Sequence, residues 1–291
     1  MISELFNIVS PVFFIALIGY LWVKQGYDFP TDFVTRINMN IGAPCLVFTG
    51  MMTLGDGLLE AGSFLAATLV SIIALMAIST LFALAFKLPA RAYIVSLYST
   101  NSGNMGIPLC LFAFGQEGMS LAIAYFALSA MFQFTVALFI SHGNLSASSL
   151  TRVSMIYGIA AAAFFILGDI EAPKWLMNTT ELMAGVTIPL MLLTLGASLA
   201  RLKLENSGRM VLISAFKIAM GLSIGFAIST LFGFTGVERN VLIMQSSMPV
   251  AIFSYLLATQ YNRSPNDVAT MIFITTLMSF ITVPLLLTYL I

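Results

Sequence analysis

Charged residues are scarce in this sequence. Asp, Glu, Lys and Arg together make up 8% of its 291 residues, about a third of the fraction usual in soluble domains. So few charges cannot cover a water-facing surface, and hydrophobic residues make up 59% of the chain. The composition therefore predicts an integral membrane protein surrounded by the lipid bilayer. The net charge of +0 also excludes a basic face, so nucleic acid is not an expected partner.

Residues that bind metals or carry out redox chemistry are also few. The only histidine is His142, and the two cysteines, Cys45 and Cys110, fall in apolar runs, which argues against a disulfide. His142 has no acidic or cysteine companion nearby, so it is a poor metal ligand. The sequence has no phosphate-binding glycine loop and no HExxH or G-x-S-x-G motif. We therefore expect no metal, no cofactor and no enzymatic activity.

Long apolar runs are abundant instead. Ten of them come close to or exceed the ~20 residues needed to cross the hydrocarbon core. They are 5–23, 33–54, 61–86, 91–114, 119–141, 151–168, 180–200, 209–233, 239–260 and 267–290. The loops between them are short. Glu4 precedes the first run without any Lys or Arg, unlike a cleaved signal peptide, so we expect this run to be retained as a helix.

Basic residues are distributed unevenly over the loops. The loops after the odd-numbered spans hold Lys24, Arg36, Lys87, Arg91, Arg152, Arg201, Lys203, Arg209 and Arg263. The opposite side holds only Lys174 and Arg239. Because Lys and Arg accumulate in cytoplasmic loops, we expect the odd-numbered loops in the cytoplasm and both termini outside it. The expected location is a plasma membrane, such as a bacterial inner membrane.

Two spans carry polar residues, glycines and a proline that a helix merely crossing lipid would not need. The fourth contains Ser99–Thr100–Asn101–Ser102–Gly103–Asn104–Met105–Gly106–Ile107–Pro108, and the ninth contains Gln245–Ser246–Ser247–Met248–Pro249. Backbone groups freed by a break must find partners, so breaks occur where the chain lines a cavity or is buried in protein. Two interrupted segments in corresponding halves of a membrane chain predict the binding site of a transporter.

The residues around these breaks suit a negatively charged ligand. If Pro108 and Pro249 each begin the second half of a broken helix, at the N1 position that tolerates proline, two positive helix ends point toward the membrane midplane and favour a carboxylate. The predicted substrate-binding residues are Asn101, Asn104, Gly106, Pro108, Gln245, Ser246, Ser247 and Pro249. The alternative is a simple kink at Pro108 and a helix–helix hydrogen bond at Asn101. The matched positions of the two motifs favour a binding site.

An internal repeat relates the two halves of the chain. The second span contains Ile41–Gly42–Ala43–Pro44 and the seventh contains Val186–Thr187–Ile188–Pro189. The prolines of the fourth and ninth spans are likewise five spans apart. An odd number of helices turns the second copy upside down, so the repeat is predicted to be inverted.

The motif from Asn101 to Pro108, with Phe114–Gly115 after it, resembles the fourth helix of the auxin efflux carrier family. This family includes plant PIN-type exporters and short prokaryotic relatives. Pro189 through Gly196–Ala197–Ser198–Leu199 resembles its seventh helix, and Gln245–Pro249 and the run to Thr282–Val283–Pro284 resemble its ninth and tenth. The resemblance covers essentially the whole chain. It implies an all-α integral membrane fold, related to bile acid/sodium symporters, with ten transmembrane helices in two inverted five-helix repeats and broken, crossing helices 4 and 9.

The resemblance also implies a mechanism. A transport unit formed by residues 61–145 (helices 3–5) and 206–291 (helices 8–10) would move against a scaffold. That scaffold would be formed by residues 1–60 (helices 1–2) and 146–205 (helices 6–7), which would also form the contact of a homodimer. The implied activity is elevator-type alternating access with organic anions, chiefly carboxylates, as substrates. The long cytoplasmic loop of the plant proteins is absent here, so plant-style regulation is not expected.

Lys217 is the one charge well inside a span. It lies eight residues after Arg209, about 12 Å along the helix axis from the cytoplasmic end. An ionisable residue at this depth is a candidate functional group, which could attract the anion, carry a proton, or stand where relatives hold a cation. The alternative, weighed equally, is that the Lys217 side chain extends to the cytoplasmic surface of the membrane.

Gln133, Pro44 and Pro189 are secondary candidates. Gln133 is a lone amide on an apolar span, which is more typical of a hydrogen bond between helices than of a ligand contact. Pro44 and Pro189 are expected to kink their helices and to shape the wall that faces the substrate. Gly221 and Gly225 are spaced for close helix packing.

The leading hypothesis is a secondary active transporter of small organic anions, with carboxylates of the auxin or dicarboxylate type as substrates and a proton or sodium as coupling ion. A sodium-coupled symporter is the first alternative. Bile acid symporters hold a carboxylate at the ninth-helix break, where this chain has Ser246, Ser247 and Met248, which weakens sodium coupling and leaves it open. A non-transporting receptor or scaffold is the second alternative, and it predicts that replacing Asn101 or Pro108 leaves function intact.

Overall fold

A computed structural model describes residues 2–54, 62–142, 154–202 and 207–290. Within these ranges every regular element is helical, and three of the elements are π-helical turns, here labelled η. The elements are α1 (Ile2–Lys24), α2 (Thr31–Ile37), η1 (Asn38–Gly42), α3 (Ala43–Leu54), α5 (Gly62–Ala85), α6 (Ala90–Tyr98), η2 (Ser102–Gly106), α7 (Ile107–Phe132), η3 (Gln133–Ala137), α8 (Leu138–His142), α10 (Met155–Leu167), α11 (Lys174–Arg201), α12 (Ser207–Leu231), α13 (Gly236–Ser247), α14 (Ile252–Gln260) and α15 (Pro265–Leu290).

Six helical stretches of the described chain are long and apolar enough to cross a membrane. They are Phe6–Lys24, Gly62–Ala85, Ser102–Ser141, Lys174–Arg201, Gly208–Leu231 and Pro265–Leu290. Large apolar side chains such as Leu81, Leu182 and Ile281 point outward on these helices, as expected for surfaces that contact lipid. The protein is therefore a multi-pass, all-helical membrane protein. The predicted number of ten spans is not settled by this count and stays a prediction.

Four predicted spans comprise more than one element. The span predicted at 33–54 consists of α2, η1 and α3, and the span at 239–260 consists of α13 and α14. Their pieces are each too short to cross a bilayer alone, which explains why these two spans are missing among the six long stretches. The span at 91–114 consists of α6, η2 and the first part of α7, and the span at 119–141 of the rest of α7, η3 and most of α8, so Ser102–Ser141 joins parts of both.

The longest apolar stretch, Ser102–Ser141, turns back on itself at Gly115. At 40 residues a straight helix would extend roughly 60 Å, about twice the hydrocarbon thickness. Gly115 has φ 68° and ψ −157°, which no helix contains. Residues on either side of it lie together: a Cβ on Gly103 would come within 2.6 Å of the Phe126 ring, and the Tyr98 hydroxyl donates to the Phe132 carbonyl at 3.4 Å. The reversal falls where the sequence predicts the loop between the fourth and fifth spans.

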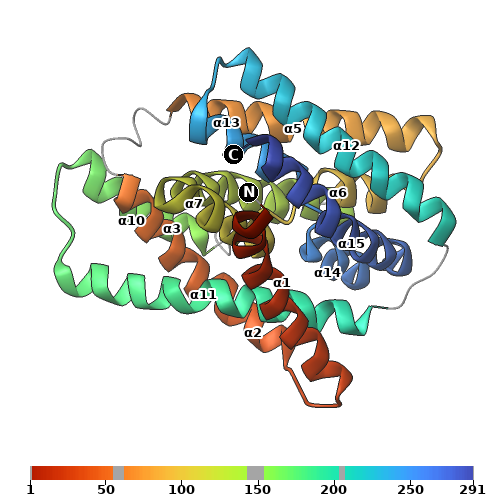
Figure 1. Ribbon diagram of the computed structural model, residues 1–291, viewed down its shortest axis with the longest axis horizontal. Coiled ribbons are helices and arrows are strands. Elements are labelled where there is room, and N and C mark those ends of the chain that lie inside the picture. The colour runs from red at the N-terminus through yellow and green to blue at the C-terminus, as the bar shows by residue number, and fades with distance from the viewer. Residues whose placement is uncertain (1, 55–61, 143–153, 203–206, 291) are drawn as a thin grey trace.

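Close helix pairs are built on glycines. Along the α1–α11 contact, Gly196 faces the backbone of Ala16 and Gly19 faces that of Leu193, and the two helices cross at the lower edge of the molecule in Figure 1. Gly221 and Gly225 place α12 against the backbone of α13, so the predicted packing role of this pair is confirmed. Any side chain at these positions would push the paired helices apart.

Candidate functional site

Two of the divided helices are broken by short extended segments. α6 ends at Tyr98, and Ser99 has φ −75° and ψ 110° before the helix resumes at Ser102. α13 ends at Ser247, and Met248 has φ −56° and ψ 149° before α14 begins at Ile252. A residue before proline is driven out of the helical region, which explains the extended geometry of Met248.

The two extended segments pair with each other. Thr100 and Val250 form an antiparallel bridge. The Asn101 N–H donates to the Pro249 carbonyl at 2.8 Å, and the Ala251 N–H donates to the Ser99 carbonyl at 3.0 Å. Peptide groups that the breaks free from their helices are thus satisfied by the opposite break, as a low-dielectric interior requires. We call the paired segments, Ser99–Asn101 and Met248–Ala251, the crossing.

The two prolines do not occupy the helix positions expected of them. Pro108 is the second residue of α7 and follows the π turn η2, six residues after the helix has resumed at Ser102. Pro249 lies inside the extended segment, three residues before α14 begins. The premise that each proline begins a half-helix therefore fails for Pro249, whereas Pro108 lies in the first turn of α7 but not where the helix resumes after the break. The reason is that Pro249 breaks α13 by its effect on Met248, whereas Pro108 is accommodated beside a π turn, where regular helix bonding is already interrupted.

Gln245 and Gly106 lie against one another beside the crossing. The Gln245 side chain is completely buried, and its Nε2 donates to the Ala122 carbonyl at 3.3 Å. A Cβ on Gly106 would collide with the Gln245 amide. Glycine at position 106 therefore makes room for an amide from the other broken helix.

The two serines that follow Gln245 have different surroundings. The Ser246 hydroxyl is 3.4 Å from the Tyr125 hydroxyl. The Ser247 hydroxyl donates back to the Met244 carbonyl of its own helix at 2.9 Å. Ser246 thus connects α13 to α7, whereas the hydrogen bond described for Ser247 stays within its own helix.

Four buried polar side chains at the crossing or directly beside it keep an atom without a hydrogen-bond partner within the described residues. These atoms are Ser99 Oγ, Asn101 Nδ2, Ser102 Oγ and Gln245 Oε1. Their side chains are almost wholly buried, with exposed fractions of 2%, 4%, 0% and 0%. A buried polar atom without a partner costs about 1–3 kcal/mol, and a bound ligand, ion or water is one source of the missing bond. The set contains both a donor and acceptors.

Lys217 is directed at the crossing. Its side chain is completely buried on α12, and Nζ donates to the Met248 carbonyl at 3.0 Å. The side chain therefore does not extend to the membrane surface. No carboxylate of the described residues pairs with it, so a carbonyl of the broken helix is the partner found for this ammonium group.

Two residues that the sequence interpretation missed also support the crossing. Thr275 on α15 accepts a hydrogen bond from the Val250 N–H at 3.2 Å and donates to the Met271 carbonyl at 2.7 Å. Tyr125, buried on α7, meets Ser246 as described. Their only signal in the sequence is a polar group inside an apolar span, which many helix contacts share. Nothing in the sequence places them opposite the crossing.

A cavity lies beside the two helices that resume after the breaks. It has a volume of about 220 Å³ and lies between α2, η1, η2, α11 and α14. Asn104 and Ile252, which follow the two breaks, line it, and so does Arg201 at the end of α11. Asn104 is half-buried, so its amide is accessible from this space. We call it the Arg201 cavity.

A second cavity lies along the N-terminal half of α11. It has a volume of about 590 Å³ and lies between α1, α3, α7 and α11, with Thr53, Gln116 and Glu181 among its lining residues. α11 lines this cavity from Glu181 to Leu192 and the Arg201 cavity from Thr194 onward. The two halves of α11 thus line different cavities, and the change from one cavity to the other falls near Leu192–Thr194. We call this space the Glu181 cavity.

The secondary candidates are dispersed. Gln133 Nε2 lies 3.5 Å from the Thr100 carbonyl and so contacts the crossing. Pro189 lines the Glu181 cavity. Pro44 is the second residue of α3 after the π turn η1, and Gly42 in that turn packs against Thr187 of α11. The two segments recognised as a sequence repeat are therefore in contact at Gly42 and Thr187.

A broken-helix crossing inside an apolar helical bundle defines a membrane transport protein as the class. Comparison with known families agrees, because the model of the family described as "Membrane transport protein" matches residues 5–152 and 150–287. The chain therefore belongs to this family, the auxin efflux carrier family that its motifs resemble. Membership of this family identifies the protein as a membrane transporter.

Two archaeal relatives are described as transporters. An uncharacterized transporter of Methanocaldococcus jannaschii is 29% identical over an alignment of 196 positions that covers 64% of this chain and 63% of the relative. An uncharacterized transporter of Methanothermobacter thermautotrophicus is 24% identical over an alignment of 296 positions that covers 95% of each chain. The second alignment spans nearly the whole of both chains, so the likeness is not confined to one half.

Proposed function

We propose that this protein is a secondary active transporter of small organic anions, and that carboxylates bind at the crossing. The observation that carries the proposal is the group of buried, unpartnered donors on Ser99, Asn101 and Ser102, next to the Lys217 amine. The free Gln245 Oε1 is an acceptor, so it would take a donor group of the substrate and not its carboxylate. A carboxylate accepts hydrogen bonds from amide, hydroxyl and backbone donors, and a nearby cation offsets its loss of hydration. Neutral ligands otherwise dominate, which lets the substrate leave again.

The backbone at the crossing adds donors to the same place. The helix that resumes at Ser102 and the helix that begins at Ile252 each expose N–H groups and the positive end of a helix dipole. These two helix starts, together with Asn104, Gly106, Pro108, Ser246, Ser247 and Pro249, complete the proposed substrate-binding region. Gln133, Pro44 and Pro189 are proposed to shape its surroundings.

Elevator-type alternating access is the proposed mechanism. In it, ten helices form two inverted five-helix repeats, and residues 61–145 and 206–291 carry the crossing past a scaffold of residues 1–60 and 146–205. The two cavities support this division, because each lies between α11 of the scaffold and elements of the moving unit. We further propose a homodimer in the plasma membrane with both termini outside the cytoplasm. The Arg201 cavity then faces the cytoplasm, and the conformation is inward-facing.

The proton is the proposed coupling ion. The Lys217 ammonium group donates to a carbonyl of the break, a ligand that a sodium ion would also use, so the two cations would compete for the same oxygen. Sodium coupling is the competing possibility. Anion uptake that survives replacement of sodium but collapses with a protonophore supports proton coupling, and the opposite pattern supports sodium.

The first experiment identifies the ligand class. Purified protein is heated with a panel of mono- and dicarboxylates at several pH values, with and without sodium. A ligand that binds the folded state raises its apparent stability with the logarithm of its concentration over Kd. Stabilisation by carboxylates and not by their uncharged amides is the expected result. Equal effects of both would remove the basis for an anion site.

The second experiment tests transport at the crossing. In proteoliposomes, Asn101→Ala is expected to lower the flux of the stabilising carboxylate about tenfold or more, because a hydrogen bond to a charged group contributes about 1.5–3 kcal/mol. Asn178→Ala is the matched control, since Asn178 is an exposed amide on α11, and it should leave the flux unchanged. Equal flux in both variants would favour a receptor or scaffold over a transporter.

A further inference from the structure

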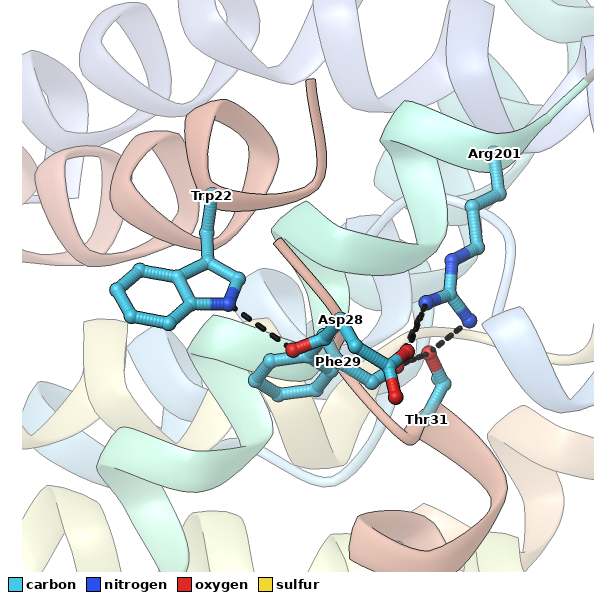
Figure 2. Close-up of polar contacts among 5 residues, drawn as sticks. All are labelled: Trp22, Asp28, Phe29, Thr31 and Arg201. Atoms are coloured by element: carbon cyan, nitrogen blue, oxygen red, sulfur yellow. Dashed lines mark hydrogen bonds and ion pairs between the residues drawn. The ribbon is translucent and has the colours of Figure 1, made fainter. Parts of the chain in front are cut away.

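Arg201 is a partly exposed cation that lines the Arg201 cavity. It is the last residue of α11, and its guanidinium group reaches across to the connection between α1 and α2. There Nη1 donates to the Thr31 hydroxyl at 2.9 Å and Nη2 donates to the Phe29 carbonyl at 2.7 Å. Nη2 also lies 3.9 Å from a carboxylate oxygen of Asp28. Figure 2 shows this cluster, with Trp22 on the other side of Asp28.

These contacts hold Arg201 only loosely. The Arg201 side chain is 45% exposed and that of Asp28 is 93% exposed, and ion pairs in such surroundings contribute little because water competes for both partners. At 3.9 Å the carboxylate is beyond hydrogen-bond distance. A guanidinium group has five N–H donors in a fork that matches a carboxylate, so the present partners do not use its full capacity.

The hydroxyl groups of α11 extend a polar stripe from this cation along the cavity. Thr194, Ser198 and Arg201 all line the cavity and follow one another at the spacing of a single helix face. Thr194 and Arg201 are about 10 Å apart along the helix axis. Asn104, three residues after the crossing, lines the same cavity. A carboxylate bound at Arg201 therefore has further hydrogen-bonding groups within the same space.

We propose that the Arg201 cavity is a second carboxylate-binding site, in which Arg201 exchanges the Asp28 carboxylate and its neighbouring acceptors for the carboxylate of the transported anion. The proposal rests on the transport of anions through the crossing. Asp28 acts as a tethered competitor, and Asp32, which also lines the cavity, repels the same ligand. Both effects keep binding weak, which suits a site that anions must enter and leave.

Trp22 is the natural probe for this exchange. Its Nε1 donates to the Asp28 backbone carbonyl at 3.1 Å, so a movement of Asp28 that follows release of its carboxylate is expected to change the surroundings of the indole ring. The chain has two tryptophans, and Trp175→Phe leaves Trp22 as the only one. We expect the emission of Trp22 in the purified full-length protein to change in a saturable manner with succinate or propionate, against NaCl at matched ionic strength.

Four variants separate binding from general effects. Arg201→Gln should abolish the response, and Arg201→Lys should restore part of it because the charge returns without the fork. Asp28→Asn should lower the half-saturating concentration about two- to fivefold, since a surface competitor is removed. Arg36→Gln is the matched control: Arg36 bonds to the backbone of the same helix and does not line the cavity, so the response should persist.

A further variant keeps the charge of Arg201 and removes one of its three partners. Thr31→Val deletes the hydroxyl acceptor while the Phe29 carbonyl and Asp28 remain, so the ligand displaces one partner fewer and the response should persist at an equal or lower half-saturating concentration. An absent response in the Trp175→Phe protein, or an equal response after Arg201→Gln, overturns the proposal. A loss of response in Thr31→Val that is as complete as in Arg201→Gln would also overturn the proposal, because the lost contact between Arg201 and Thr31 would then explain both results. Asn101→Ala should keep the Trp22 response while losing flux, and unchanged flux there would refute transport through the crossing without touching this site.

Discussion

Lys217 is the residue whose surroundings depart furthest from what its type prefers. An ammonium group in a protein interior is costly unless it is paired and hydrogen-bonded, and here the partner found is a main-chain carbonyl of a broken helix. The carbonyl in turn is available because Met248 has left the helix. The charge and the break therefore stabilise one another, which explains why a lysine is kept so deep in an apolar bundle.

Replacing Lys217 with methionine tests this mutual dependence. The side chain stays long and apolar, but the charge and the bond to Met248 are lost. We expect carboxylate flux in proteoliposomes to fall about ten- to a hundredfold, corresponding to about 1.5–3 kcal/mol for a hydrogen bond to a charged group. Thermal unfolding measured in parallel distinguishes lost function from a lost fold. Normal flux in a stable Lys217→Met protein would show that the ammonium group takes no part in transport.

At the scale of elements, the close contact of α12 and α13 holds Lys217 at the crossing. Gly221 lies four residues after Lys217 on α12, and a Cβ there would collide with the Ser246 carbonyl, whereas Gly208 on the same helix has open space around it. Both are helical glycines, so they differ mainly in what faces them. The spacing between the two helices therefore depends on Gly221.

Gly221→Ala and Gly208→Ala should have different effects. Alanine at position 221 forces the backbones apart, and overpacking of this kind costs about 1–3 kcal/mol. Alanine at position 208, the second residue of α12, meets no neighbouring atoms and is expected not to lower stability, because alanine loses less conformational freedom on folding than glycine. Thermal unfolding in detergent should give a lower Tm for the first and an equal or higher Tm for the second. A lower Tm in both would point to a general intolerance of α12.

At the scale of the whole molecule, the two cavities along α11 carry different charged groups. The Arg201 cavity includes a guanidinium group and the Asp32 carboxylate, whereas Glu181 is the charged residue that lines the other cavity. Asn104, three residues after the crossing, lines the Arg201 cavity. In an elevator mechanism the crossing would alternate between these spaces, and an anion would meet a cation on one side and an acidic group on the other.

Single cysteines can follow this alternation. In a protein without Cys45 and Cys110, Ser198→Cys should react with a membrane-impermeant thiol reagent from the cytoplasmic side, and Thr53→Cys should react from the outside, since each residue lines one cavity. A saturating carboxylate on the outside should change the two labelling rates in opposite directions. Rates that do not respond to ligand, or both cysteines labelled from one side, would contradict alternating access between these cavities.

Composition and local motifs predicted much of this architecture. Few charges and long apolar runs predicted a helical membrane protein, and the glycines, amides and prolines around Asn101 and Pro249 marked the two helices that are broken. Gly115 was placed near the predicted loop, where its positive φ reverses the chain. These features are local, because they depend on hydration and on the backbone preferences of single residues.

Contacts between distant segments were decided by the tertiary structure alone. The pairing of Thr100 with Val250, the direction of Lys217, the support from Tyr125 and Thr275, and the place of Arg201 in a cavity join residues far apart in sequence. The exact helix starts around Pro108 and Pro249 also followed from packing. The sequence by itself determined which segments must be helical in lipid and at which residues those helices are easily broken. Only the folded chain decided which partner each freed peptide group and buried charge would find, because that depends on which helices the packing of the whole bundle brings together.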